Sequence, residues 1–135
     1  MSPSDLIGRT YPAVRYGVTR SAIDAYVAAV SEDADVYGEI APPMFAVLYA
    51  GAALPAALFD PELGIDFSHL VHGAQAFRWP GPVVRAGDVI DTVLSVAEIR
   101  QTAGLTFYGL ATVSENADGE VVAEGLWTNI VREAP

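Results

Sequence analysis

The feature that most constrains this chain is a segment near its middle, residues 40–59, that contains no charged side chain. Its length approaches that of a helix spanning a bilayer, but three prolines interrupt it and no Lys or Arg anchors either end. We therefore predict a buried helix of a globular protein, from Met44 to about Ala53, with Pro43 in its first turn and a break or kink at Pro55. Because its residues are apolar on every side, we expect other structure to enclose it.

Before this helix, the pattern predicts a short strand over residues 11–16 and then a helix with its N-cap at Thr19 and its end near Ser31. One apolar stripe at helical spacing supports this helix: Ile23, Tyr26, Val27 and Val30. The acidic segment 32–38 has no periodicity, and we expect a loop there.

From residue 70 onward the spacing changes, and four strand-like runs are predicted at residues 71–79, 89–99, 105–114 and 120–131. Hairpin signals separate the last three runs, at residues 102–104 and 116–119. Consecutive strands joined by short loops are antiparallel neighbours or nearly so. Apolar residues lie on both faces of these strands, so the sequence predicts a sheet with one face covered by the helix and the other available to a partner subunit.

The composition limits what the chain can do. Its 135 residues suit a single domain, residues 1–135, with a core that needs no disulfides, and the chain has no cysteine. A net charge of -10 makes nucleic acid and membrane surfaces poor partners. The N-terminus does not resemble a signal peptide, so we expect a cytoplasmic protein. The hydrophobic fraction, 52%, indicates that some apolar surface meets a second subunit.

Three ordered motifs carry a family resemblance. Residues 72–77 read HGAQAF, residues 82–88 read PVVRAGD, and residues 41–45 read APPMF. Together they resemble the signatures of MaoC-like dehydratases, in particular the N-terminal dehydratase family, over most of the chain. The resemblance implies an α+β hot-dog fold, in which a curved antiparallel sheet of about five strands wraps one long buried helix, and it implies a dimer.

The resemblance also implies a chemistry. Members of this superfamily are hydratases or dehydratases, lyases that act on acyl thioesters of CoA or acyl carrier protein in fatty acid or polyketide metabolism, without a cofactor. Active members carry an acid-x-Asn-Pro-x-His motif, and alignment on Val36 places Tyr37 at the histidine. A phenol with a pKa of about 10 is a poor proton shuttle at pH 7. We therefore expect this chain to lack the usual catalytic dyad of an acid and a histidine.

Candidate site residues follow from the motifs. His72, Asp35 and Tyr37 are the candidate catalytic groups, and we predict no metal ligands. The backbone N–H groups of Met44 and Phe45 are candidates for holding a thioester oxygen at the helix start. Gly73 and Gln75 are candidates for substrate binding. On an unbroken strand His72 and Gln75 would point to opposite faces, so a shared site requires a bulge at Gly73.

The sequence leaves several functions open. The chain fits the substrate-binding subunit of a heterodimeric (3R)-hydroxyacyl dehydratase whose partner supplies the dyad. It also fits a homodimer in which His72 and a carboxylate of the acidic loop have taken over catalysis. A hot-dog thioesterase and a non-catalytic module that binds a small apolar ligand are further alternatives. His72 could equally form an ordinary hydrogen bond at a strand edge.

Overall fold

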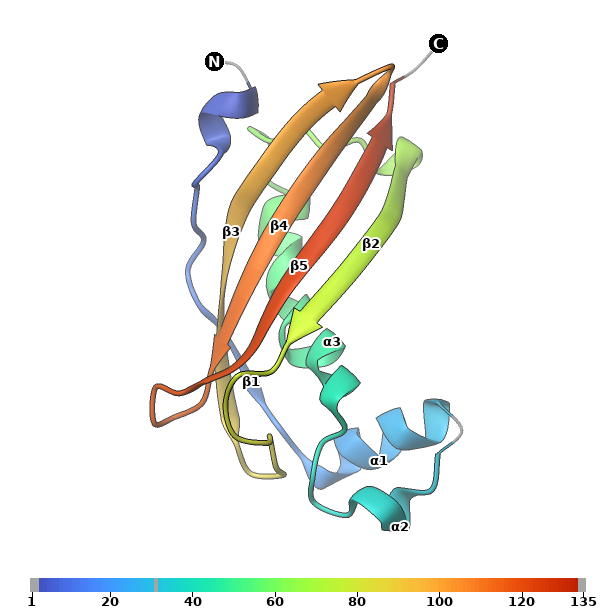
Figure 1. Ribbon diagram of the computed structural model, residues 1–135, viewed down its shortest axis with the longest axis vertical. Helices are drawn as coiled ribbons and strands as arrows, with labels where there is room; N and C mark the ends of the chain where they lie inside the picture. Colours follow the sequence, from blue (N-terminus) through green and yellow to red (C-terminus); the bar gives the residue numbers. More distant parts are fainter. Residues whose placement is uncertain (1–2, 31, 134–135) are drawn as a thin grey trace.

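The computed structural model describes residues 3–30 and 32–133. A curved five-stranded antiparallel sheet forms one layer, and a helical run lies along its concave face (Figure 1). The strands lie in the order β1-β3-β4-β5-β2. The core lies between the sheet and the helical run. Within the described residues, no helix is long and apolar enough to cross a membrane.

The four strands predicted after residue 70 are present. They are β2 (Leu70–Arg78), β3 (Val89–Thr102), β4 (Leu105–Glu115) and β5 (Val121–Arg132). The two-residue loop between β3 and β4 consists of Ala103 and Gly104, whose φ angles of 48° and 80° fit the type I′ turn that such a hairpin prefers. In the next hairpin, the Asn116 side chain accepts the backbone N–H groups of Asp118 and Glu120.

The strand β2 does not pair with β3, the next strand along the chain, although consecutive strands are most often neighbours in a sheet. It pairs with β5 at one edge of the sheet, whereas β3 pairs with β4 and with β1 (Val14–Gly17). The intervening segment, residues 79–88, is long enough to carry the chain across the end of the sheet. This crossing places the PVVRAGD motif, residues 82–88, beside the start of the helical run. The outer edge of β2 has no partner strand among the described residues.

The first helix, α1 (Arg20–Ala29), has the predicted cap: Thr19 Oγ1 accepts the Ala22 N–H at 3.1 Å. Ile23 and Val27 are fully buried, but Val30 is 47% exposed, because it lies beyond the last helical turn. The predicted end at Ser31 falls outside the described residues. The predicted first strand is shorter and later than expected, since only residues 14–17 form β1, and Thr10 makes an isolated bridge to Ser95.

The central helical run is longer than predicted. It consists of four consecutive pieces: η2 (Pro43–Phe45), α3 (Ala46–Tyr49), η3 (Gly51–Ala53) and α4 (Leu54–Leu58). Pro55 does not end the run, because it lies in the first turn of α4, where a missing N–H breaks no intrahelical hydrogen bond.

The expectation that this run is enclosed on every side is wrong for the single chain. Its inner row is fully or almost fully buried: Phe45, Ala46, Tyr49, Ala50, Ala53 and Ala57. On its outer side Met44 is 42% exposed, Leu48 is 37% exposed and Phe59, directly after α4, is 70% exposed. The side facing away from the sheet is thus an apolar stripe that the chain itself leaves in contact with water; we call Met44, Leu48 and Phe59 the outer stripe.

The acidic segment is not a plain loop. Residues Ala34–Tyr37 form a single helical turn, α2, and the Asp33 side chain accepts the Asp35 backbone N–H at 2.9 Å. A carboxylate that bonds an N–H at the start of a turn is a common capping arrangement. At least one acidic residue of the segment therefore has a local structural role.

Candidate functional site

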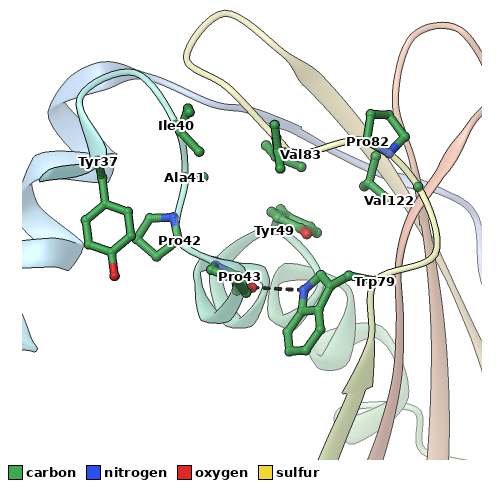
Figure 2. Close-up of a pocket in the computed structure, with 12 residues that line it drawn as sticks. Tyr37, Ile40, Ala41, Pro42, Pro43, Tyr49, Trp79, Pro82, Val83 and Val122 are labelled. Carbon is green, nitrogen blue, oxygen red and sulfur yellow. Dashed lines mark hydrogen bonds between the residues drawn. The ribbon is translucent and has the colours of Figure 1, made fainter.

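A cavity of about 240 Å³ lies at the amino end of the central helical run. Its walls come from the segment before η2, from α3, from the crossing segment 79–84 and from β5 (Figure 2). The lining residues are Tyr37, Ile40, Ala41, Pro42, Pro43, Tyr49, Trp79, Gly81, Pro82, Val83, Val84 and Val122. None of these residues carries an imidazole or a carboxylate, so the cavity is largely apolar.

Two of the three sequence motifs form the walls of this cavity by bonding to each other. The Ala41 N–H donates to the Val84 carbonyl at 2.8 Å, and the Ala86 N–H donates to the Glu39 carbonyl at 2.8 Å. The turn of the second motif is closed by the Asp88 carboxylate, which accepts the Arg85 backbone N–H at 2.8 Å. The Arg85 backbone and the Asp88 side chain therefore fix the turn that precedes β3.

Trp79 forms the side of the cavity nearest β2. Its indole N–H donates to the Pro43 carbonyl at 3.0 Å, which holds the ring against the start of the helical run (Figure 2). The residue is 41% exposed, so it forms part of the mouth rather than the floor. Sequence analysis did not single out Trp79, although it lies two residues after the HGAQAF motif.

Tyr49 lies deeper in the same cavity and is 2% exposed. Its backbone carbonyl accepts a hydrogen bond from Thr92 Oγ1 at 3.3 Å. Burial raises the pKa of its phenol to about 12, so the hydroxyl stays protonated at neutral pH. Sequence analysis did not single out Tyr49 either, because a tyrosine in an apolar helix is usually a core residue.

The two candidates of the acidic segment have different positions. Tyr37 is half-buried and lines the cavity, with its hydroxyl directed away from the centre (Figure 2). Asp35 is exposed and does not belong to the lining. In one chain the structure therefore brings Tyr37, and not Asp35, to the cavity.

The backbone donors predicted at the helix start are only partly available. The Phe45 N–H donates to the Pro42 carbonyl at 2.9 Å, which closes the first 3₁₀ turn. No such partner is found for the Met44 N–H within the described part of the chain. Of the two predicted donors, Met44 is therefore the one that a ligand could use.

The third motif lies on β2, where the required bulge is present. The register with β5 shifts between His72 and Ala74, so that His72 lies opposite Asn129 and Gln75 lies opposite Trp127. Directly opposite residues share a face, and Trp127 approaches Gly51 of the helical run. His72 and Gln75 therefore both face the helix side. A Cβ at position 73 would lie 2.6 Å from Ile130 Cδ1, so a larger residue there would require the Ile130 side chain to shift.

His72 is nevertheless remote from the cavity. It lies near the start of β2 and Trp79 follows its end, a separation of about 20 Å at the usual rise of a strand. His72 is exposed, and its ring lies 6.4 Å from that of Trp127. In one chain the structure does not bring His72 together with Asp35 or Tyr37, and their catalytic roles stay predictions.

A buried amide lies next to His72. Asn129, on β5, is 6% exposed, and its Nδ2 has no hydrogen-bond partner among the described residues. On β4 its opposite neighbour is Tyr108, whose hydroxyl donates instead to the Leu63 carbonyl at 3.3 Å. The sequence offered no signal for Asn129, since it occurs in a strand among polar and apolar residues alike.

Comparison with known proteins identifies the family. A model of the family described as FAS1-like, dehydratase domain region, matches residues 5–125. The chain belongs to this family. A UPF0336 protein from Saccharopolyspora erythraea is 34% identical to this dehydratase-region chain over 139 residues, a match that covers 93% of the chain and 88% of the relative.

Solved structures show the same fold. A chain of the HadBC (3R-hydroxyacyl-ACP dehydratase) complex from Mycobacterium tuberculosis is similar with a TM-score of 0.77 and 20% identity, covering 96% of this chain and 99% of that one. A MaoC-like dehydratase from Rhodospirillum rubrum is similar with a TM-score of 0.63 and 19% identity, covering 96% of this chain and 94% of that one. The predicted hot-dog fold of the dehydratase-region chain is confirmed.

Proposed function

We propose that this chain is the substrate-binding subunit of a hydro-lyase that acts on acyl thioesters of CoA or acyl carrier protein. One observation carries the proposal: the cavity at the amino end of the helical run is apolar and has no imidazole or carboxylate in its lining. Hydration and dehydration require a group that moves a proton near neutral pH. A subunit with such a cavity binds the acyl group, and its partner supplies the acid and base.

The outer stripe supports a hot-dog partner chain. Met44, Leu48 and Phe59 expose apolar side chains, and the outer edge of β2 has no partner strand among the described residues. An exposed strand edge pairs readily with another chain. The likeness to a chain of the HadBC complex agrees with a heterodimer of this kind. In that arrangement the partner covers the stripe and completes the site with an acid-x-Asn-Pro-x-His motif.

The activity test follows the loss of conjugated-thioester absorbance with crotonyl and longer enoyl thioesters. We expect the chain alone to be inert, and we expect turnover when a motif-containing hot-dog chain from the same genome is added. The proposal would be overturned if the partner chain turned over enoyl thioesters by itself and the present chain increased neither its rate nor the length of substrate that it accepts. Release of free thiol without hydration would identify a thioesterase instead.

The interface is tested with two matched variants. Leu48 on the outer stripe is 37% exposed, and Val93 on the convex face of the sheet is 39% exposed. An aspartate at either position costs the single chain little, because both side chains already contact water. We expect Leu48→Asp to abolish assembly in light scattering and Val93→Asp to leave it intact. Equal behaviour of the two variants would argue against this interface.

A homodimer is a second candidate, favoured by the bulge at Gly73. The bulge directs His72 and Gln75 to the helix side at the free edge of β2. If two copies pair antiparallel through this edge, His72 of one copy moves toward the cavity of the other. In this case the chain alone turns over enoyl thioesters, and His72→Ala removes the activity while leaving the dimer intact.

A further inference from the structure

The hydroxyl of Tyr49 is the one polar side-chain group that lies deep in the cavity. Figure 2 shows the ring between Val83 and Trp79, with its oxygen directed into the space that these residues enclose. The side chain is 2% exposed, and within the described residues no group accepts from or donates to its hydroxyl. The nearby Trp79 N–H is already bonded to the Pro43 carbonyl.

Among the described residues, the Tyr49 hydroxyl oxygen is not sealed from water, so its hydrogen bonds are made with whatever occupies the cavity. Phenylalanine would fill the same volume without presenting a polar group to the cavity. The chain uses phenylalanine at the neighbouring position Phe45, whose ring lies 6.3 Å from that of Tyr49 in a fully buried site. A hydroxyl that faces a cavity and has no partner among the described residues is available to a molecule that enters the cavity.

The properties of the cavity restrict that molecule. Burial keeps the Tyr49 hydroxyl protonated and uncharged at neutral pH, so it acts as a hydrogen-bond donor. The apolar lining disfavours a charged group such as phosphate. A volume of about 240 Å³ is below the roughly 300–1,000 Å³ of typical ligand pockets. The occupant is therefore a short apolar group with an uncharged acceptor oxygen.

We propose that Tyr49 is a specificity-determining residue that donates a hydrogen bond to an oxygen of the acyl group of a bound short-chain acyl thioester. This inference rests on the proposed function, because the acyl thioester is taken from it. Two oxygens have the required chemistry: the thioester carbonyl oxygen, and a hydroxyl oxygen at C3 of the acyl chain. Sites that bond a substrate oxygen discriminate strongly against analogues without it.

The experiment compares Tyr49→Phe with Tyr108→Phe in the full chain. Tyr108 is a matched control because it is also buried, but its hydroxyl is bonded to the Leu63 carbonyl and lies outside the cavity lining. Isothermal titration measures the affinity for 3-hydroxybutyryl-CoA, butyryl-CoA and free CoA, with and without the partner chain. We expect Tyr49→Phe to weaken 3-hydroxybutyryl-CoA about 10-fold or more, without loss of thermal stability and without effect on free CoA.

The control variant should show the reverse, a lower Tm with unchanged affinity. If the C3 oxygen is recognised, the unmodified chain prefers 3-hydroxybutyryl-CoA to butyryl-CoA and Tyr49→Phe removes the preference. If the carbonyl oxygen is recognised, Tyr49→Phe weakens both thioesters equally. Thioester binding that Tyr49→Phe leaves unchanged would overturn this inference alone. Failure of the unmodified chain to bind any thioester, with or without its partner, would overturn the proposed function as well.

Discussion

At the amino end of the central helical run a buried phenol has no hydrogen-bond partner in the described part of the chain, whereas phenols near the carboxyl end are bonded. Tyr108 donates to the Leu63 carbonyl at 3.3 Å, and Tyr11 donates to Asp60 Oδ2 at 2.7 Å. Tyr108 and Tyr11 thus hold the loop after the helical run in place, whereas the Tyr49 hydroxyl faces a cavity. The bonded hydroxyls stabilise the fold, whereas the hydroxyl that faces the cavity is available to the proposed ligand.

The largest expected effect tests whether the amino end of the helical run is tightly packed outside its cavity. Phe45 is fully buried and contacts the rings of Tyr16, Tyr26 and Tyr49. We expect Phe45→Ala to lower the free energy of unfolding by about 3–5 kcal/mol, as for other buried aromatic residues. Urea denaturation measures the change.

The control for this variant lies at the carboxyl end. Phe59 is 70% exposed and stacks on Phe67, with ring centroids 4.9 Å apart. We expect Phe59→Ala to cost about 1 kcal/mol or less. If both substitutions cost the same, the division of the run into a buried row and an outer stripe is wrong.

The next effect concerns the bonded carboxyl end. Asp60 accepts from Tyr11 and from Arg9 Nη1, the latter at 2.9 Å, so that the loop after α4 is tied to the N-terminal segment. We expect Tyr11→Phe to lower the free energy of unfolding by about 1.5 kcal/mol, because the lost bond had a charged acceptor. A variant as stable as the original chain would show that the tie does not contribute.

The same bond predicts a pH dependence. The hydrogen bond from Tyr11 is the main cause that holds the pKa of Asp60 below its usual range, against the opposing effect of desolvation. A carboxyl with a lowered folded-state pKa stabilises the fold above its unfolded pKa of about 3.9, and this contribution is lost as pH falls through the folded pKa. The stability difference between the original chain and Tyr11→Phe should therefore be full at pH 6 and shrink below about pH 4.

Tyr108 and Tyr49 should also differ in how much their hydroxyls contribute to the stability of the chain without ligand. We expect Tyr108→Phe to lower the free energy of unfolding by about 1 kcal/mol, the usual contribution of one hydrogen bond. Tyr49→Phe should leave stability unchanged or raise it, since it removes a hydroxyl without a partner in the chain. Thermal denaturation of the two variants side by side decides the point, and equal losses would contradict it.

The smallest expected effect concerns the mouth of the cavity. Trp79→Phe keeps an aromatic ring but removes the N–H that bonds the Pro43 carbonyl. Because this site is 41% exposed, water can replace the bond, and we expect a loss of about 0.5 kcal/mol. In the variant the only tryptophan is Trp127, which is 4% exposed, so acrylamide should quench its fluorescence weakly. Strong quenching would indicate that the mouth has opened.

Much of the fold could be predicted because its signals are local. The strands after residue 70, the two hairpin turns and the cap at Thr19 depend on residues close in sequence, and the structure confirms them. The predicted break or kink at Pro55 agrees with the end of one helical piece at Ala53 and the start of another at Leu54, but the helical run continues to Leu58, because a proline in the first turn of a new piece is tolerated. The loop predicted at the acidic segment was wrong, since the side chain of Asp33 caps the turn of α2.

The candidate site was harder to predict because its parts are distant in sequence. The motifs gave the walls of the cavity, and the spacing of His72 and Gln75 gave the bulge at Gly73. The motifs could not show that segment 79–88 crosses the end of the sheet, or that His72, near the start of the edge strand β2, lies about 20 Å from the cavity. Tyr49 and Asn129 gave no local signal, since an unpaired polar group is defined by what surrounds it in space.

The amino-acid sequence by itself determined the secondary structure after residue 70, the central apolar helix and the family, because side-chain period, turn residues and motifs act over a few positions. The tertiary structure alone decided which side of that helix is buried, which strand edge is free and which phenol lacks a partner. The physical reason is that burial and hydrogen-bond satisfaction are properties of neighbours in space. Separate segments meet only when the sheet curves around the helix.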